Sequence, residues 1–248
     1  MSELEIDVAA GTMRVRINRP STLNAISTSV KRGLIDALDE AERRTDVSCF
    51  LLTGTGRAFC SGADINELDQ VAAAETLQAS LDRVMTTQRL VERCRRSTRA
   101  VVVAVNGIAA GGGVSLALAG DVIIASESAS FNLLFGRRGL IPDGALSRTL
   151  VEAVGRRRAL ALSLTCSDIA AARALEIGLV DEVVPDGDLL DRAESICAEM
   201  HERGITTIAL TKQVFTPGSN ADLSIEALAQ ATLLTRESPG QSETKGLT

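Results

Sequence analysis

Short apolar runs, several of them ending in glycine, recur along the first half of the chain and alternate with amphipathic stretches. The segments 47–54 (VSCFLLTG), 100–107 (AVVVAVNG) and 121–126 (DVIIAS) are almost continuously apolar, which is typical of parallel strands buried on both faces. Residues 12–19 instead alternate apolar and polar positions and predict a half-buried strand that closes at Pro20. The pattern predicts an α/β protein with a parallel sheet.

Helical spacing of apolar residues predicts the segments that connect and follow these strands. Helices are expected over 27–44 and over the long, charged stretch 67–96. The last third is rich in such patterns, at 156–166, 167–178, 189–204 and 224–237. We therefore expect a core at 1–190 and a helical C-terminal region at 191–248 that belongs to the same domain family, within a chain long enough to bury a sizeable core.

Charge and composition exclude several classes of partner. The formal net charge of −6 leaves no basic footprint for nucleic acid or an anionic membrane, and the chain has neither Trp nor Tyr for base stacking. The start of the chain lacks the basic and apolar regions of a signal peptide, and no run is long enough to span a bilayer. Five scattered cysteines without a Cys-x-x-Cys pair indicate no disulfide framework and no metal site, which favours a reducing cytoplasm.

Two glycine-rich turns, at 51–65 and 103–121, each follow a predicted buried strand. Neither matches a nucleotide-binding fingerprint, because Phe59 and Leu116 stand where the last glycine would be required. A nucleophilic triad is also excluded, since the one histidine, His201, lies in a charged segment and is expected to be exposed. The two turns could each offer a backbone N–H to one ligand oxygen, as an oxyanion hole does. The alternative is that the glycines serve tight packing of strands against helices.

Five segments, 19–27, 54–65, 104–121, 138–155 and 161–185, resemble the crotonase (enoyl-CoA hydratase/isomerase) superfamily in the family's order. The resemblance implies a crotonase-like spiral of ββα units with a helical C-terminal region. It also implies an acyl-CoA thioester as substrate, no metal or redox cofactor, and assembly as a homotrimer or a dimer of trimers. By the same resemblance, the backbone N–H groups of Ala63 and Gly112 are the donors to the thioester oxygen.

The resemblance further implies which residues cradle CoA. They lie in a turn after the first predicted strand and in the loop of the first glycine-rich segment: Leu23, Asn24, Ala25, Cys60, Gly62, Asp64 and Ile65. Among them, Asp64 is expected to bind loop amides rather than to act as an acid or base. Cys60 is expected to be a small buried residue, because no base that could activate its thiol is near it in sequence.

The sequence departs from the family pattern at the two carboxylates that hydratases use, because Ser115 and Phe135 occupy those positions. Hydration of a conjugated thioester usually employs both carboxylates, so weak hydratase activity is expected. Asp143 remains, at a position that some isomerases of the superfamily use as acid/base, and moving a double bond needs only one proton carrier. An enoyl-CoA isomerase is therefore favoured. A hydratase with an atypical site and a non-catalytic acyl-CoA binding protein stay open, and Asp143 could instead only stabilise a Pro-Asp-Gly turn.

Overall fold

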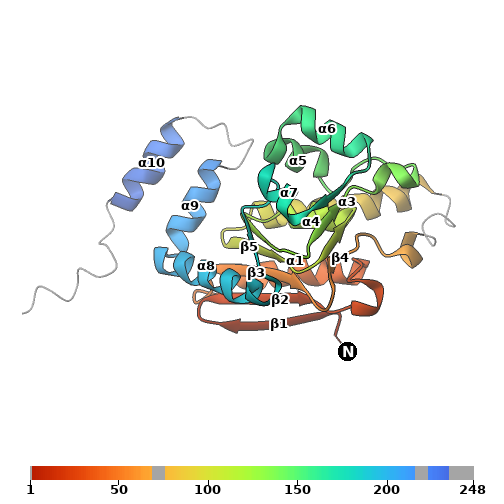
Figure 1. Ribbon diagram of the computed structural model, residues 1–248. Coiled ribbons are helices and arrows are strands. Elements are labelled where there is room, and N and C mark those ends of the chain that lie inside the picture. Colours follow the sequence, from red (N-terminus) through yellow and green to blue (C-terminus); the bar gives the residue numbers. More distant parts are fainter. Residues whose placement is uncertain (1, 69–75, 216–222, 235–248) are drawn as a thin grey trace, which may run out of the picture.

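The computed structural model describes residues 2–68, 76–215 and 223–234, and two sheets form its centre (Figure 1). The large sheet has the strand order β1 (Leu4–Ala9), β2 (Thr12–Ile17), β3 (Cys49–Gly54), β5 (Ala100–Val105), β7 (Val122–Ser126) and β10 (Glu182–Val184). The small sheet has the order β4 (Ala58–Cys60), β6 (Ile108–Ala110), β8 (Ser130–Asn132) and β9 (Asp168–Ala170). All neighbours are parallel except β1 with β2 and β8 with β9, so the predicted parallel α/β class is confirmed.

A repeating unit of two strands and a helix relates the two sheets. The pairs β3–β4, β5–β6 and β7–β8 each give their first strand to the large sheet and their second to the small one. Each pair leads into a helix, namely α3 (Leu77–Arg95), α4 (Gly112–Ala117) and α5 (Leu146–Val154). This winding is the spiral of ββα units that the resemblance implied. The second strands have only three residues each, too few to show a periodicity in the sequence.

The strands of the large sheet are apolar throughout because both faces of the sheet are covered. On one face, Phe50 and Leu52 of β3 join the main core, to which α1 (Thr28–Arg43) contributes its apolar side. On the other face, Cys49 and Leu51 pack with the buried side of α8 (Leu189–Arg203), which lies along β2 and β3 in Figure 1. Successive side chains of a strand point to opposite faces of the sheet. A strand that is covered on both faces therefore has apolar residues at every position.

The predicted helices are confirmed with two changes. Helix α1 starts where the pattern placed it, and the Ser27 hydroxyl caps it by accepting from Val30 N–H at 3.2 Å. Helix α3 covers the second part of the predicted stretch 67–96, of which 69–75 lie outside the described residues. The single helix predicted over 167–178 is wrong at its start, because β9 pairs with β8 before α7 (Ala171–Glu176) begins. Buried Ile169 at the centre of β9 pairs with Phe131, and this tertiary contact overrides the local pattern.

The C-terminal third is helical, as the sequence predicts. It contains α6 (Arg156–Leu164), α8, α9 (Ile205–Phe215) and α10 (Leu223–Leu234), and Figure 1 shows α9 and α10 following α8 on the outside of the molecule. Residues 216–222 and 235–248 lie outside the described part of the chain. The predicted boundary at 190/191 falls inside α8, which packs on the large sheet, and a division at that point stays a prediction. Among the described helices, none has the length and apolarity to cross a membrane.

Candidate active site

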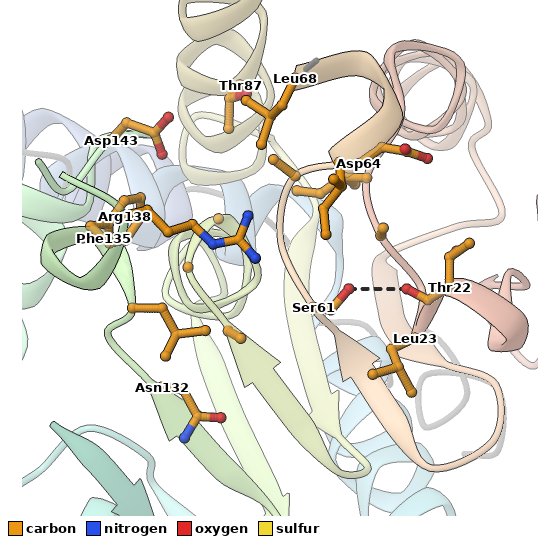
Figure 2. Close-up of a pocket in the computed structure, with 18 of the residues that line it drawn as sticks. Thr22, Leu23, Ser61, Asp64, Leu68, Thr87, Asn132, Phe135, Arg138 and Asp143 are labelled. Atoms are coloured by element: carbon orange, nitrogen blue, oxygen red, sulfur yellow. Dashed lines mark hydrogen bonds between the residues drawn. The ribbon is translucent and has the colours of Figure 1, made fainter. Parts of the chain in front are cut away.

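A cavity of about 740 Å³ lies between the two glycine-rich turns and the segment that follows β8 (Figure 2). Figure 2 shows Asp143 and Phe135 on one side of it and Ser61, Thr22 and Leu23 on the other. Seven of the residues predicted from the sequence line this one cavity: Leu23, Ala25, Ala63, Asp64, Ile65, Gly112 and Asp143. The fold therefore brings the predicted oxyanion donors and the predicted proton carrier to the same space.

The glycine-rich turns approach each other so closely that side chains are excluded. Gly62 has φ +93°, and a Cβ there would lie 2.6 Å from the Ala110 carbonyl oxygen. A Cβ on Gly113 would lie only 2.0 Å from the Cys60 carbonyl oxygen. Tight packing, the alternative considered for these glycines, is therefore present at Gly62 and Gly113. Gly112 differs, since a Cβ there would make only ordinary contacts, the nearest at 3.6 Å to Ile26.

Two backbone N–H groups on the cavity wall have no acceptor. Within the described part of the chain, neither Ala63 N–H nor Gly112 N–H donates a hydrogen bond, although both residues line the cavity. The two amides are close neighbours, because a Cβ on Gly112 would lie 3.9 Å from Ala63 N. Their local backbone is fixed by the bond from Ile26 N–H to the Gly62 carbonyl at 2.7 Å. Two unsatisfied donors on one wall can bind an oxygen that gains negative charge.

Asp143 lies between the 3-10 turn at Phe135–Arg138 and α5, and a hydrogen bond from α4 holds its backbone. The hydroxyl of Ser115, which is fully buried, donates to the Asp143 carbonyl oxygen at 3.0 Å. Gly144 follows with φ +58°, and a Cβ there would lie 3.0 Å from the Ser115 Cβ. Ser115 therefore does not reach the cavity, and its observed contact holds the turn that carries Asp143.

The Asp143 carboxylate lines the cavity without an ion-pair partner among the described residues. Burial raises the pKa of Asp143 above the ordinary value for an aspartate, and the positive charges of Arg83 and Lys31 oppose this only in part. Phe135, 8% exposed, forms an apolar part of the same cavity wall. A carboxyl group with a raised pKa beside an apolar wall is suited to taking up and returning a proton.

Asp64 is a structural carboxylate, in line with the sequence expectation. It accepts from the Arg19 guanidinium at 2.7 Å and from Asn66 N–H at 3.0 Å. Burial acts to raise the pKa of Asp64, but the hydrogen bonds from Arg19 and Asn66 outweigh it and hold the pKa below its ordinary value. The partner Arg19 was not predicted. Asp64 thus stays charged and ties the first glycine-rich turn to the turn at 19–25.

Three of the residues assigned to CoA binding, Asn24, Cys60 and Gly62, do not line the cavity. Cys60 is fully buried, and burial raises the pKa of its thiol to about 12, so the expectation of an inert small residue is met. Its sulfur accepts from Gly62 N–H at 3.3 Å. Cys60 and Gly62 pack against the second turn and support it, and the assignment of Asn24, Cys60 and Gly62 to CoA binding stays a prediction.

Asn24 also supports the turn in which it lies. Its side chain is fully buried, accepts from Arg19 N–H at 2.9 Å, and donates to the carbonyl oxygens of Thr55 and Ala58 at 2.9 and 2.7 Å. Its φ of +57° is a backbone conformation that asparagine tolerates better than most residues. The first hydrogen bond closes the turn at 19–25, and the other two link that turn to the segment that joins β3 and β4.

Replacing Asn24 with alanine is expected to lower the free energy of unfolding by about 2–4 kcal/mol, because a fully buried side chain loses its three hydrogen bonds. Urea denaturation of the purified variant measures this loss. Thr22→Ala is the matched control in the same turn, since it removes only one exposed hydrogen bond to Arg19 O. Equal stability of the two variants would contradict the structural role of Asn24.

Basic residues of the cavity wall were missed by the sequence analysis. Lys31, Arg57 and Arg83 line the cavity, and so does Arg138, whose neighbour Arg137 is paired with Asp168 at 3.1 Å. For Lys31 a signal existed, because it precedes Leu34 and Leu38 at helical spacing on the apolar side of α1.

The one histidine of the chain lies away from the cavity. His201 is exposed, as predicted, and its Nδ1 lies 2.9 Å from the Ser48 hydroxyl, outside the cavity lining. No cluster of potential metal ligands occurs among the residues that the structure describes.

Comparisons with known proteins agree with this geometry. The family model described as enoyl-CoA hydratase/isomerase matches residues 7–248. A 1,2-epoxyphenylacetyl-CoA isomerase of Escherichia coli is 37% identical over 83% of this chain and 79% of its own length. A probable enoyl-CoA hydratase of Rhodobacter capsulatus is 35% identical over 93% and 89%. An enoyl-CoA hydratase structure from Bacillus anthracis, 29% identical, superposes with a TM-score of 0.89 and covers 95% of this chain and 92% of that one. The chain belongs to the enoyl-CoA hydratase/isomerase family, that is, to the crotonase superfamily.

Proposed function

We propose that this chain is an enoyl-CoA isomerase that moves a double bond of an acyl-CoA thioester between the β,γ and α,β positions. The proposal rests on one observation: of the two carboxylates that the described residues place on the cavity wall, one is in an ion pair and the other is not. Asp64 is held by Arg19, whereas Asp143 has no ion-pair partner among the described residues. One available carboxylate is sufficient for a reaction in which a proton leaves one carbon and returns to another.

The proton moves in two steps. The Asp143 carboxylate removes a proton from the α-carbon of a β,γ-enoyl thioester. The electron pair of the broken C–H bond forms a double bond from the α-carbon to the carbonyl carbon, and the carbonyl π pair moves to the thioester oxygen. Ala63 N–H and Gly112 N–H stabilise the resulting dienolate, because both donors are unsatisfied before the substrate binds. The protonated Asp143 then returns the proton to the γ-carbon, which leaves the double bond between the α and β carbons. The carboxylate is regenerated, and no redox cofactor or metal is required by these steps.

Hydration is the second candidate, and the similarity to a probable enoyl-CoA hydratase of Rhodobacter capsulatus favours it. Against it stand the two positions where hydratases of the family have glutamate. Ser115 is buried beneath the Asp143 turn, and Phe135 offers only an apolar surface. Among the described residues of the cavity wall, a water molecule would therefore find a single unpaired carboxylate to activate it and to manage the proton at the α-carbon. Isomerisation makes fuller use of the groups that are present.

The remaining substrate contacts follow from the cavity wall. We assign the CoA moiety to Leu23, Ala25 and Ile65 of the cavity wall, and Figure 2 shows Leu23 on the side opposite Asp143. Exposed Arg57 lies on the wall of the same cavity without an ion-pair partner in the described part of the chain, which supports the binding of phosphate groups there. The acyl group then extends toward Asp143 and Phe135.

We further propose that copies of the chain associate as a trimer or a dimer of trimers. Phe215 of α9 is 81% exposed and Leu228 of α10 is 70% exposed, and large apolar side chains at such positions favour burial by another copy. A reducing cytoplasmic location is proposed as well. It is supported by the five cysteines, all of which are buried and none of which forms a disulfide.

The kcat/KM for isomerisation is expected to fall as the pH is lowered through the pKa of Asp143, because only the carboxylate can remove the α-proton. Since burial raises this pKa, the midpoint should lie above the ordinary range of an exposed aspartate. Initial rates between about pH 4 and pH 8 measure it. A rate that shows no such midpoint down to the ordinary aspartate range would contradict the role of Asp143.

The proposal is tested by giving the wild type a matched panel of β,γ- and α,β-enoyl-CoAs of equal chain length. We expect interconversion of the two isomers at a rate well above hydration of the α,β-enoyl-CoA. Rapid hydration would favour the second candidate. Binding of the thioesters without turnover would identify a non-catalytic acyl-CoA binding protein.

A further inference from the structure

Lys31 is a buried cation that has no partner among the described residues. It lies on α1, is 1% exposed, and is among the largest fully buried side chains of the molecule. It lines the active-site cavity but forms no hydrogen bond or ion pair with the described residues. An ammonium group withdrawn from water is costly unless a charged or polar partner approaches it. A ligand in the cavity can be that partner.

Arg83 is a second cation of the same wall. It lies on α3, which packs against α1, and its guanidinium has no ion pair within the described part of the chain. Lys31, Arg83 and Asp143 line the same cavity, and both cations act electrostatically on the Asp143 carboxylate. Burial, followed by the charge of Arg83, lowers the pKa of Lys31, while Glu67 and Asp143 act in the opposite direction.

The nearby carboxylates do not neutralise this pair. Glu67 does not line the cavity, and its oxygens accept hydrogen bonds from the backbone and hydroxyl of Thr28 at 2.8 to 3.0 Å. Asp143 is close enough to interact with Lys31 but makes no ion pair with it. Lys31 and Arg83 both line the cavity, and within the described part of the chain their side-chain N–H groups have no acceptor, so a ligand there can supply one.

We propose that Lys31 and Arg83 form a carboxylate-binding subsite at the acyl end of the cavity, which selects acyl-CoA thioesters whose acyl chain ends in a second carboxylate. The inference rests on the proposed function, because it assigns the substrate class of that same site. An ammonium and a guanidinium together match the oxygens of a carboxylate better than they match a terminal methyl group. An apolar acyl chain would leave both cations without a partner.

A different role for Lys31, setting only the pKa of Asp143, makes a different prediction. Loss of the Lys31 charge would raise the pKa of Asp143 further, since Lys31 now acts to lower it. That change would affect all substrates alike, because every substrate uses the same base. Recognition of a terminal carboxylate changes the ratio between matched ligands, even when no reaction takes place.

The experiment compares saturated, unreactive ligands by isothermal titration calorimetry: adipoyl-CoA against hexanoyl-CoA, and glutaryl-CoA against pentanoyl-CoA. For at least one pair we expect the wild type to bind the carboxylate-terminated ligand about tenfold tighter or more, the scale of a charge-assisted hydrogen bond. Lys31→Met should reduce this ratio to about one, since methionine fills similar space without charge. Lys31→Arg should keep most of the ratio, and Arg83→Met should lower it independently.

Two results would overturn the subsite. One is a wild type that binds the methyl-terminated ligand as tightly in both pairs. The other is a ratio that persists in both Lys31→Met and Arg83→Met while circular dichroism shows both variants folded. Failure of the proposed function has another signature, because it concerns turnover. A wild type that prefers carboxylate-terminated ligands but isomerises no enoyl-CoA would keep the subsite and refute the isomerase.

Discussion

Replacing Gly112 with proline is expected to lower kcat for isomerisation by about a hundred- to a thousandfold, the loss seen when one oxyanion donor is removed. Proline has no N–H, so only Ala63 N–H would remain to stabilise the dienolate oxygen. Gly112 is the first residue of α4, a position at which proline is tolerated because its N–H has no partner within the helix. The variant should therefore fold, and steady-state kinetics with a β,γ-enoyl-CoA measure the loss.

Gly112→Ala is the control for this variant. It keeps the N–H group, and its Cβ would lie 3.6 Å from the Ile26 side chain and 3.9 Å from Ala63 N, which are ordinary contacts. Its loss of kcat should be much smaller than that of the proline variant. If both substitutions reduce kcat equally in folded proteins, the effect comes from the added atoms, and the proposed role of the Gly112 amide is refuted.

Asp143→Asn is expected to lower kcat by about a hundredfold or more, the scale of general acid–base catalysis, with little change in the affinity for acyl-CoA. Asparagine preserves the shape of the side chain but cannot carry the proton between the two carbons. The turn should persist, because the Ser115 hydroxyl and the Leu146 N–H both donate to the backbone carbonyl oxygen of residue 143, each at 3.0 Å. Kinetics and calorimetry on the same preparation separate the effect on kcat from the effect on binding.

Asp64→Asn is the matched variant, because it neutralises the other carboxylate of the cavity wall. Its main effect should be on stability, since the ion pair with Arg19 is lost. An Asp143→Asn enzyme that isomerises as fast as wild type would show that Asp143 only stabilises its turn. An Asp64→Asn enzyme with the greater loss of kcat would transfer the catalytic role to Asp64.

The long strands could be predicted from the sequence because burial on both faces makes them apolar at every position, as in β3 and β5. The short strands β4, β6 and β8 could not. Each has three residues, and pairing with one another, rather than local preference, makes them strands. The strand β9 was hidden for the same reason, since its three residues precede a helix and pair only through tertiary contact with β8.

The candidate site could be predicted where glycine spacing and family resemblance pointed to the backbone, as at Ala63 and Gly112. The sequence could not distinguish residues that line the cavity from residues that support its turns. Asn24 and Cys60 lie within the matching segments, yet both are buried away from the cavity. Lys31 follows an apolar residue in a charged helix, and such lysines usually face solvent. Its helical spacing with Leu34 and Leu38 was the local signal to the contrary, but its full burial depends on the packing of α3 against α1, which is a tertiary contact.

The most direct test of the isomerase assignment is the product that the wild type forms from a single β,γ-enoyl-CoA in water. NMR and mass spectrometry distinguish the conjugated α,β isomer, which has the mass of the substrate, from the 3-hydroxyacyl-CoA, which has gained one water. We predict that the conjugated isomer accumulates and that the hydroxy product stays a minor component when the reaction reaches equilibrium between the two isomers. Rapid accumulation of 3-hydroxyacyl-CoA, or recovery of the β,γ-enoyl-CoA unchanged, would contradict the account.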